Sequence, residues 1–217
     1  MPERGVFVTF EGGEGSGKST QAALLAQRLR DGGLPVVALR EPGGTPLGDD
    51  IRDLLLDPAY AGMDPMAELL LYEASRAQLV AETIETSLAA GRHVVCDRFT
   101  DSTTAYQGYG RGLDLEQVRV LNSAASRGLV PDLTVLVDVD PVLGLERACG
   151  QGADRLEAED VAFHERVREG FLRIAAEKAE RVVVVDGTPG VAEVAAAVRR
   201  VVAAALPVLR PVLDWRA

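Results

Sequence analysis

The amino-acid sequence predicts an α/β fold in three layers, in which a five-stranded parallel sheet lies between two layers of helices. Five short apolar runs rich in β-branched residues predict buried strands, and segments with helical periodicity separate them. Strands that alternate with helices in this way form βαβ units, whose strands run parallel. Such sheets bind ligands at the carboxyl ends of their strands. The predicted strands cover residues 5–10, 35–40, 92–97, 133–139 and 181–186.

The helical segments carry start and stop signals. The first one stops at Gly32-Gly33, which is typical of a helix end. Thr45 and Pro46 suit the cap and the first position of the second helix. Asp114 and Gln117 match a capping box at the start of a later one. The expected helices include residues 22–29, 47–55, 65–90, 114–128, roughly 159–180 and 190–205.

Two further segments are expected to be irregular. Residues 99–112, "FTDSTTAYQGYGRG", are polar, glycine-rich and aromatic, which predicts an elaborate loop. The tail at 207–217 contains two prolines and is expected to be extended or packed as a strap.

Length and composition indicate one compact domain over residues 1–217. Hydrophobic residues make up 47% of the 217 residues and charged residues 26%, as in globular proteins. We see no internal repeat, low-complexity linker or composition break, and no apolar run reaches the length that a bilayer requires. The first residues contain no secretory signal, so the cytoplasm is the expected location.

Charge and cysteine content narrow the function classes. A net charge of -10 argues against a general binder of nucleic acids or anionic membranes, so any phosphate chemistry is expected to be confined to a pocket. Cys96 and Cys149 belong to no CxxC motif or Cys/His cluster, which argues against a disulfide framework and a zinc site. Both are expected to be free thiols.

The stretch "FEGGEGSGKST" at residues 10–20 carries the strongest functional signal. Its Gly-x4-Gly-Lys-Ser pattern lies between a predicted strand and a predicted helix, the context of a phosphate-binding loop. Backbone N–H groups and the helix N-terminus surround phosphate oxygens, while the lysine reaches the outer phosphates and the serine can ligate Mg²⁺. The loop therefore predicts a nucleoside triphosphate with Mg²⁺, bound by Gly12, Gly13, Glu14, Gly15, Ser16, Gly17, Lys18, Ser19 and Thr20.

The loop alone leaves the phosphoryl acceptor open. Water as acceptor would define an NTPase or GTP-dependent switch, and a small molecule would define a kinase. Arg40 and Arg98 follow two predicted strands, where two guanidinium groups can grip one phosphate monoester. Asp97 ends a strand and resembles the acid that orients Mg²⁺ in phosphate-loop enzymes. A guanine-reading "NKxD" stretch does not occur in the sequence, which disfavours the switch.

Two other pairs are less specific on their own. Tyr72 and Arg76 lie four residues apart on one helix face, so they can stack a base and bind its carbonyl edge; spacing alone favours a core tyrosine beside a solvated arginine. Arg147 and Arg155 flank a glycine-containing stretch that looks like a lid over residues 147–158, and position alone distinguishes that lid from a solvated loop.

Four segments in order, "FEGGEGSGKST", "REPGGT", "DRFTDSTTAYQG" and "ADRLE", resemble bacterial thymidylate kinases, which are P-loop nucleoside monophosphate kinases. The resemblance runs from about Val6 to the C-terminal helix and implies a P-loop kinase fold with a short lid. It implies transfer of the γ-phosphoryl group of ATP to dTMP, with Mg²⁺ as cofactor. A kinase for another nucleoside monophosphate or a small metabolite is the alternative.

The resemblance also implies roles for individual residues. Arg40 and Arg98 match arginines that hold the dTMP phosphate. Tyr72 and Arg76 match a pair that stacks on thymine and reads its O4. The remaining matches are Tyr106 against the sugar C2′, Glu14 near the 3′-hydroxyl, Asp97 at magnesium, Arg147 on adenine and Arg155 in the lid, with Ser102, Thr103 and Gln107 also at the substrate.

The sequence departs from the family pattern at three places. Tyr72 stands where the family usually has phenylalanine, and Thr103 occupies a variable position. Cys149 and Gln151 stand in the lid where arginines are expected, which leaves Arg155 with most of the catalytic work. The resemblance further suggests a cis peptide at Glu41-Pro42.

The reaction implied here needs no general base, because a phosphate oxygen is already anionic. Lys18, Arg98, Arg155 and Mg²⁺ would supply positive charge. The 65–90 helix carries apolar residues more broadly than one sheet-facing stripe requires, which predicts a homodimer through this helix.

Overall fold

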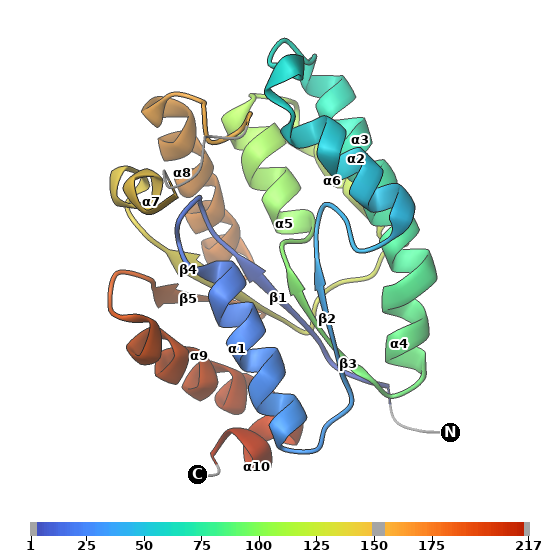
Figure 1. Cartoon of the computed structure of the whole chain (residues 1–217), viewed down its shortest axis with the longest axis vertical. Helices are drawn as coiled ribbons and strands as arrows, with labels where there is room; N and C mark the ends of the chain where they lie inside the picture. Colours follow the sequence, from blue (N-terminus) through green and yellow to red (C-terminus); the bar gives the residue numbers. More distant parts are fainter. Residues whose placement is uncertain (1–3, 149–154, 215–217) are drawn as a thin grey trace.

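The computed structural model describes residues 4–148 and 155–214 and contains a five-stranded parallel sheet (Figure 1). The strand order is β2-β3-β1-β4-β5, and every adjacent pair is parallel. All five predicted strands are confirmed, with ends shifted by at most two residues. They are β1 (Phe7–Glu11), β2 (Val36–Arg40), β3 (His93–Asp97), β4 (Leu133–Asp138) and β5 (Val182–Asp186).

Helices cover both faces of the sheet, as predicted (Figure 1). On one face, α1 (Lys18–Asp31) and α9 (Val191–Ala205) pack over Val8, Phe10 and Val135. On the other face, Phe7, Val94 and Leu136 contact a second layer of helices. Successive strand residues therefore serve opposite cores, because side chains alternate along a strand. This second layer includes α3 (Pro65–Leu79), α4 (Glu85–Ala89), α6 (Leu115–Ala125) and α8 (Val161–Glu177), and the shorter α7 (Pro141–Ala148) follows β4.

Local caps agree with the sequence signals. The Thr45 hydroxyl accepts a hydrogen bond from the Gly48 N–H at the start of α2 (Pro46–Leu56), and Asp114 accepts one from the Gln117 N–H before α6. The predicted 65–90 helix is interrupted, because η2 (Val80–Ile84) is a π-helical turn between α3 and α4. A short 3₁₀ turn, η1 (Pro58–Tyr60), links α2 to the following loop.

The predicted loop at 99–112 is helical, so this prediction is wrong. It forms α5 (Thr100–Thr103) and the π-helical η3 (Thr104–Gly110). Its glycines and β-branched residues have low helix propensity, but burial against α8 outweighs propensity. A Cβ on Gly110 would lie 2.8 Å from the Phe163 ring, so the close approach of η3 to α8 requires glycine there.

The expected extended tail is also wrong within the described residues. It forms η4 (Pro207–Leu209) and α10 (Arg210–Leu213), which turn back over α1 (Figure 1). Leu209 and Leu213 are buried in the same core as α1 and α9, and this burial stabilises two short helices that would not form in isolation.

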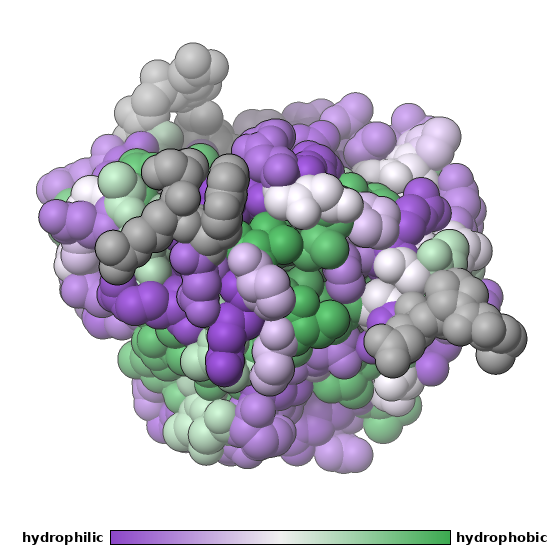
Figure 2. Space-filling view, turned by 90° about the horizontal axis from the view of Figure 1, so that it is seen from below, coloured by the Kyte–Doolittle hydropathy of each residue, from purple (hydrophilic) through white to green (hydrophobic). Residues whose placement is uncertain are grey.

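The structure also bears on the predictions made for the cysteines, for one proline and for membrane spans. Cys96 is a free thiol buried in β3, and Cys149 lies outside the described residues. Burial raises the pKa of the Cys96 thiol. The Glu41–Pro42 peptide is cis, as the family resemblance suggested. No helix in residues 4–148 and 155–214 is long and apolar enough to cross a membrane, and Figure 2 shows a face on which hydrophilic residues surround smaller apolar areas.

Candidate active site

The phosphate loop joins β1 to α1 at the carboxyl edge of the sheet. Gly15 and Gly17 have φ values of 62° and 86°, a region that L side chains rarely adopt. A Cβ on Gly15 would lie 1.9 Å from the Gly144 carbonyl oxygen of α7, so both conformation and space require glycine. Gly17 precedes the first turn of α1, which leaves the N–H groups of that turn available to an anion.

Lys18 is buried and reaches back over this loop. Its Nζ donates to the Gly13 carbonyl oxygen over 3.1 Å and lies 3.9 Å from a Glu14 carboxylate oxygen. Burial and the neighbouring Arg98 charge lower the pKa of Lys18. A bound phosphate would counter both effects, because its negative charge stabilises the ammonium form.

Three strand ends meet beside the loop. Asp97 of β3 is in register with Arg40 of β2 and with Phe10 of β1. Within the part of the chain that the structure describes, the Arg40 side chain has no hydrogen bond or ion pair, so its guanidinium group is available to a ligand in the cavity that it lines. The Asp97 Oδ1 atom is buried and has no protein partner within the described chain, which fits a bound cation or water at this edge.

Arg98 is held in an unusual backbone conformation with φ of 70°. Its side chain donates to Glu14 Oε1 over 2.6 Å, to the Ser102 hydroxyl over 3.1 Å and to the Tyr106 hydroxyl over 3.2 Å. Glu11 stabilises this turn, because its carboxylate accepts hydrogen bonds from the Phe99 N–H and from the Ser102 hydroxyl. A strained residue fixed from several sides is typical of a functional site.

Two carboxyl groups near Arg98, those of Glu14 and Glu11, have pKa values shifted in opposite directions. Desolvation raises the pKa of Glu14, but the charges of Arg98 and Lys18 outweigh it and lower that pKa to about 2. For Glu11, burial and the nearby Asp101 charge outweigh the Arg98 charge and the hydrogen bonds from Ser102 and Phe99, and they raise its pKa to about 8. Tyr106 donates its hydroxyl proton to Glu14 over 2.6 Å, and burial raises its pKa. The loop carboxylate therefore stays charged where it faces the cations.

Arg76 lines the other end of the cavity and is buried. Its Nε donates to Glu41, its Nη1 to Glu73 and Asn122, and its Nη2 to Thr103. Desolvation opposes its charge, but Glu41 and Glu73 raise its pKa, so it stays protonated. Every guanidinium nitrogen has a protein partner, and these contacts fix the side chain at the cavity wall.

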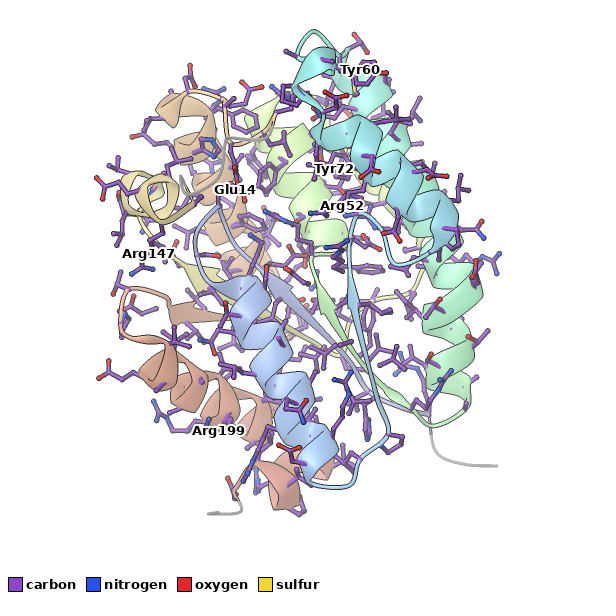
Figure 3. The ribbon with its side chains drawn as sticks, in the orientation of Figure 1. Glu14, Arg52, Tyr60, Tyr72, Arg147 and Arg199 are labelled. Atoms are coloured by element: carbon purple, nitrogen blue, oxygen red, sulfur yellow. The ribbon has the colours of Figure 1, made fainter. Side chains whose placement is uncertain are left out.

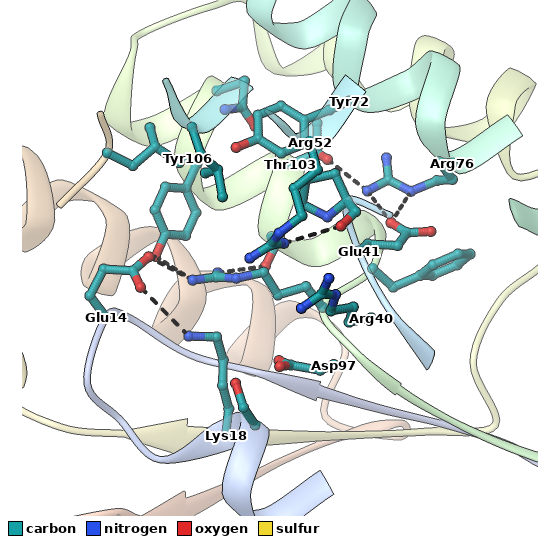
Figure 4. A pocket seen from close by; sticks show the side chains of 18 of the residues that line it. Glu14, Lys18, Arg40, Glu41, Arg52, Tyr72, Arg76, Asp97, Thr103 and Tyr106 are labelled. Atoms are coloured by element: carbon teal, nitrogen blue, oxygen red, sulfur yellow. Dashed lines mark hydrogen bonds and ion pairs between the residues drawn. The ribbon is translucent and has the colours of Figure 1, made fainter. Parts of the chain in front are cut away.

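These groups line one cavity of about 280 Å³ (Figure 4). It reaches from Lys18 and Asp97 to Tyr72, so charged groups for phosphate and an aromatic ring for a base share one space. Of the residues predicted for substrate, cation or catalysis, it is lined by Glu14, Lys18, Ser19, Arg40, Tyr72, Arg76, Asp97, Arg98, Ser102, Thr103, Tyr106 and Gln107.

Sequence reasoning missed Arg52. This α2 residue lines the cavity and donates to the Pro42 carbonyl oxygen over 3.1 Å. Figure 3 shows it just below Tyr72 and to the right of Glu14, at the carboxyl edge of the sheet. The sequence signal that could have identified Arg52 is its position in the predicted helix directly after the Arg40 segment.

Arg155, predicted as a catalytic lid arginine, is not among the residues that line the cavity in this structure. Its side chain is buried against α2 and α3: Nη1 donates to Glu68 over 2.5 Å and Nε donates to the Leu55 carbonyl oxygen over 2.8 Å. A buried guanidinium group needs such partners, because an unpaired charge is costly away from water. Its neighbours Leu156 and Glu157 line the cavity instead. Residues 149–154 of the predicted lid lie outside the described residues.

Arg147 lies at the end of α7, away from the cavity (Figure 3). It donates to the carbonyl oxygens of Gly187 and Thr188 in the loop before α9, over 2.9 and 3.0 Å. The structure therefore brings most of the predicted acceptor-site residues together and keeps Arg147 on the far side of the phosphate loop.

The fold and this site define a P-loop kinase. The family model described as thymidylate kinase matches residues 10–198. The chain belongs to the thymidylate kinase family.

Relatives support this membership over most of the chain. The thymidylate kinase of Trichlorobacter lovleyi is 50% identical over 94% of this chain and 99% of its own. That of Deinococcus radiodurans is 52% identical over 85% and 90%. The crystal structure of thymidylate kinase from Ehrlichia chaffeensis superposes with a TM-score of 0.75 at 38% identity, covering 92% of this chain and 98% of that one.

Proposed function

We propose that the cavity binds dTMP and that the phosphate loop binds ATP, with their phosphates meeting near Lys18. Family membership makes the chain an ATP-dependent nucleoside monophosphate kinase that converts dTMP to dTDP. The observation that carries the assignment is the single cavity lined by Lys18 at one end and by Tyr72 and Gln107 at the other.

Arg40, Arg52 and Arg98 supply the phosphate end of this cavity. Guanidinium groups bind phosphate oxygens in a bidentate manner, and three of them surround the space next to Asp97. A phosphate on Arg98 would share that residue with Glu14, whose carboxylate holds the guanidinium in place. At the other end, Tyr72 provides a ring for stacking, while Arg76, Thr103 and Gln107 provide polar contacts.

The protein's work in this reaction is positioning and charge neutralisation. The attacking phosphate oxygen of dTMP is anionic, so no side chain needs to remove a proton. Lys18 and Arg98 face the space between the two nucleotides and would stabilise charge on the transferred phosphoryl group. Tyr106 packs at the same wall, where it would contact the sugar.

Ser19 and Asp97 would hold Mg²⁺ with the ATP phosphates. Within the described residues, no group of three His, Cys, Asp or Glu side chains could hold a metal, so phosphate oxygens and water would complete the coordination of Mg²⁺. The unpartnered Asp97 Oδ1 fits this role. Bound Mg²⁺ supplies positive charge that offsets the charge of the phosphate oxygens.

The remaining roles are proposals that rest on the family. They are ATP contacts by residues 12–20, adenine stacking by Arg147, a single domain over 1–217 with a lid at 147–158, and a cytoplasmic location. A homodimer would use α3, whose Leu70 is half exposed, together with exposed Leu47 and Leu54 on the adjacent α2.

The function is tested by coupled assay of ADP release with dTMP, dUMP, CMP, AMP and GMP as acceptors. We expect dTMP to give the highest kcat/KM and activity to require Mg²⁺. Turnover that prefers a ribonucleotide would support the alternative of another nucleoside monophosphate kinase. GTP hydrolysis without any acceptor would support a switch.

A further inference from the structure

We propose that Glu68 is a positioning residue for base choice: it holds the Gln107 amide so that the carbonyl oxygen faces the cavity and accepts the N3–H of a thymine-type base. This inference rests on the proposed binding of dTMP in the cavity. Glu68 itself does not line that cavity, so it would act through Gln107.

The hydrogen bond between Gln107 and Glu68 is short and buried. The Gln107 Nε2 atom donates to Glu68 Oε1 over 2.7 Å. Glu68 is completely buried and Gln107 is 1% exposed, so water does not compete for this hydrogen bond. Gln107 comes from η3 and Glu68 from the first turn of α3, so the contact joins two elements that form the cavity wall.

The charge of Glu68 dictates which end of the amide it binds. An ionised carboxylate accepts hydrogen bonds and cannot donate one, so it binds the NH₂ group and excludes the carbonyl oxygen. Burial raises the pKa of Glu68, but hydrogen bonds from Arg111 and Gln107 and the charges of Arg111 and Arg155 outweigh burial and lower it. Glu68 therefore remains ionised at neutral pH.

Two arginines fix the carboxylate itself. Arg111 donates to both Glu68 oxygens, over 3.2 and 3.1 Å, and Arg155 donates to Oε2 over 2.5 Å. The Gln107 amide is therefore bound to a group that cannot rotate to follow it. Among the described contacts of Gln107, the side-chain oxygen has none, and it belongs to a side chain that lines the cavity.

The fixed amide distinguishes pyrimidines by the polarity of one edge. Thymine and uracil present an N3–H donor, which the Gln107 oxygen accepts. Cytosine presents an N3 acceptor, which would face that oxygen as a second acceptor. A buried polar group left without its partner costs more than a hydrogen bond contributes, so the mismatch weakens dCMP binding.

The inference is tested by measuring kcat/KM for dTMP, dUMP and dCMP with wild type and Glu68→Gln. A glutamine at position 68 can donate as well as accept, so it no longer fixes the amide. We expect the dTMP-to-dCMP ratio to fall about tenfold, the equivalent of one hydrogen bond. The dTMP-to-dUMP ratio should stay constant, because both bases present the same edge. An unchanged dTMP-to-dCMP ratio would overturn the inference.

Glu159→Gln is the matched control, because it makes the same Glu-to-Gln change at the other carboxylate partner of Arg111 and leaves the contact between Glu68 and Gln107 in place. It should retain the dTMP-to-dCMP ratio within about twofold. If it lowers that ratio as much as Glu68→Gln does, general loosening of the wall explains the effect, and the inference is wrong.

A double-mutant cycle tests whether Glu68 acts through Gln107. In a Gln107→Leu background, Glu68→Gln should have no further effect on the dTMP-to-dCMP ratio. An equal effect in both backgrounds contradicts the inference. Wild type that fails to phosphorylate dTMP would instead overturn the proposed function.

A measurement on wild type covers the case in which Glu68→Gln does not fold. Side-chain amide protons of Gln107, labelled with ¹⁵N and assigned by their absence in Gln107→Leu, should exchange slowly with and without dTMP, since they face a buried carboxylate. Rapid exchange in the free protein would show that the amide is not fixed and would overturn the inference.

Discussion

Arg98 donates to Glu14 over 2.6 Å, and this ion pair joins the third strand to the phosphate loop. Both side chains line the cavity, and the Tyr106 hydroxyl donates to the same Glu14 oxygen. A loop residue thus orients the arginine that would bind the acceptor phosphate. The arrangement makes the loop and the acceptor site one electrostatic unit, and its parts can be tested separately.

The Glu14 carboxylate should stabilise the fold in a pH-dependent manner. Its pKa is lowered from 4.5 to about 2, so its contribution is present above pH 4.5 and is lost as the pH falls toward 2. Denaturant unfolding of wild type and Glu14→Gln between pH 5 and pH 2 should show a difference that shrinks by up to about 3 kcal/mol. A difference independent of pH would contradict this.

Arg98→Ala should lower kcat by about 10²-fold or more, because it removes one preorganised positive charge near the transferred group. Steady-state kinetics with dTMP and ATP measure this. Arg127→Ala is the control: Arg127 also has a positive φ, of 54°, but lies on the surface in an ion pair with Glu85. Near-normal turnover of Arg98→Ala would remove the acceptor-site assignment.

Tyr72 should contribute through its ring more than its hydroxyl. Tyr72→Phe keeps the ring, so kcat/KM for dTMP should change less than about threefold. Tyr72→Ala removes a stacking surface worth about 1–3 kcal/mol and should lower kcat/KM about tenfold or more. Equal losses in both variants would show that the hydroxyl, and not stacking, matters.

Arg155 should matter for stability before any nucleotide binds. Arg155→Gln leaves Glu68 buried with one partner fewer and should lower the unfolding free energy of the free protein by about 3 kcal/mol. Arg173→Ala removes an exposed partner of Glu169 and should leave unfolding unchanged. If Arg155→Gln retains full stability without ligand and loses only turnover, Arg155 acts on the phosphates as first predicted.

The proposed dimer should depend on α3. Light scattering at micromolar concentration should report twice the monomer mass for wild type and a monomer for Leu70→Glu, because a buried charge opposes association. Leu24→Glu changes a similarly exposed leucine on α1 and should leave the dimer intact. A monomeric wild type rules the proposal out.

Much of the fold was accessible from local sequence. Buried parallel strands are continuous apolar runs, and Thr45 and Asp114 mark helix starts through contacts within three residues, so each signal lies in one short segment. The same holds for the phosphate loop, whose glycines are required by its own backbone and by one close approach to α7.

Residues 99–112 and the tail were misjudged because their helices depend on distant partners. Tyr106 packs on Phe163 and Phe171, which lie more than fifty residues later in the chain. Leu213 is buried in the core that α1 forms at the other end of the sequence. Weak local propensity hides a helix that tertiary burial stabilises.

The sequence by itself determined the phosphate loop, the succession of strands and helices along the chain, and the arginines that follow the strand ends. Only the tertiary structure decided how those charges are shared: that Arg155 pairs with Glu68, that Arg52 reaches the cavity, and that Glu68 binds the Gln107 amide. The reason is physical, since the partner of a buried charge is chosen by proximity in space, which residue type and local spacing do not encode.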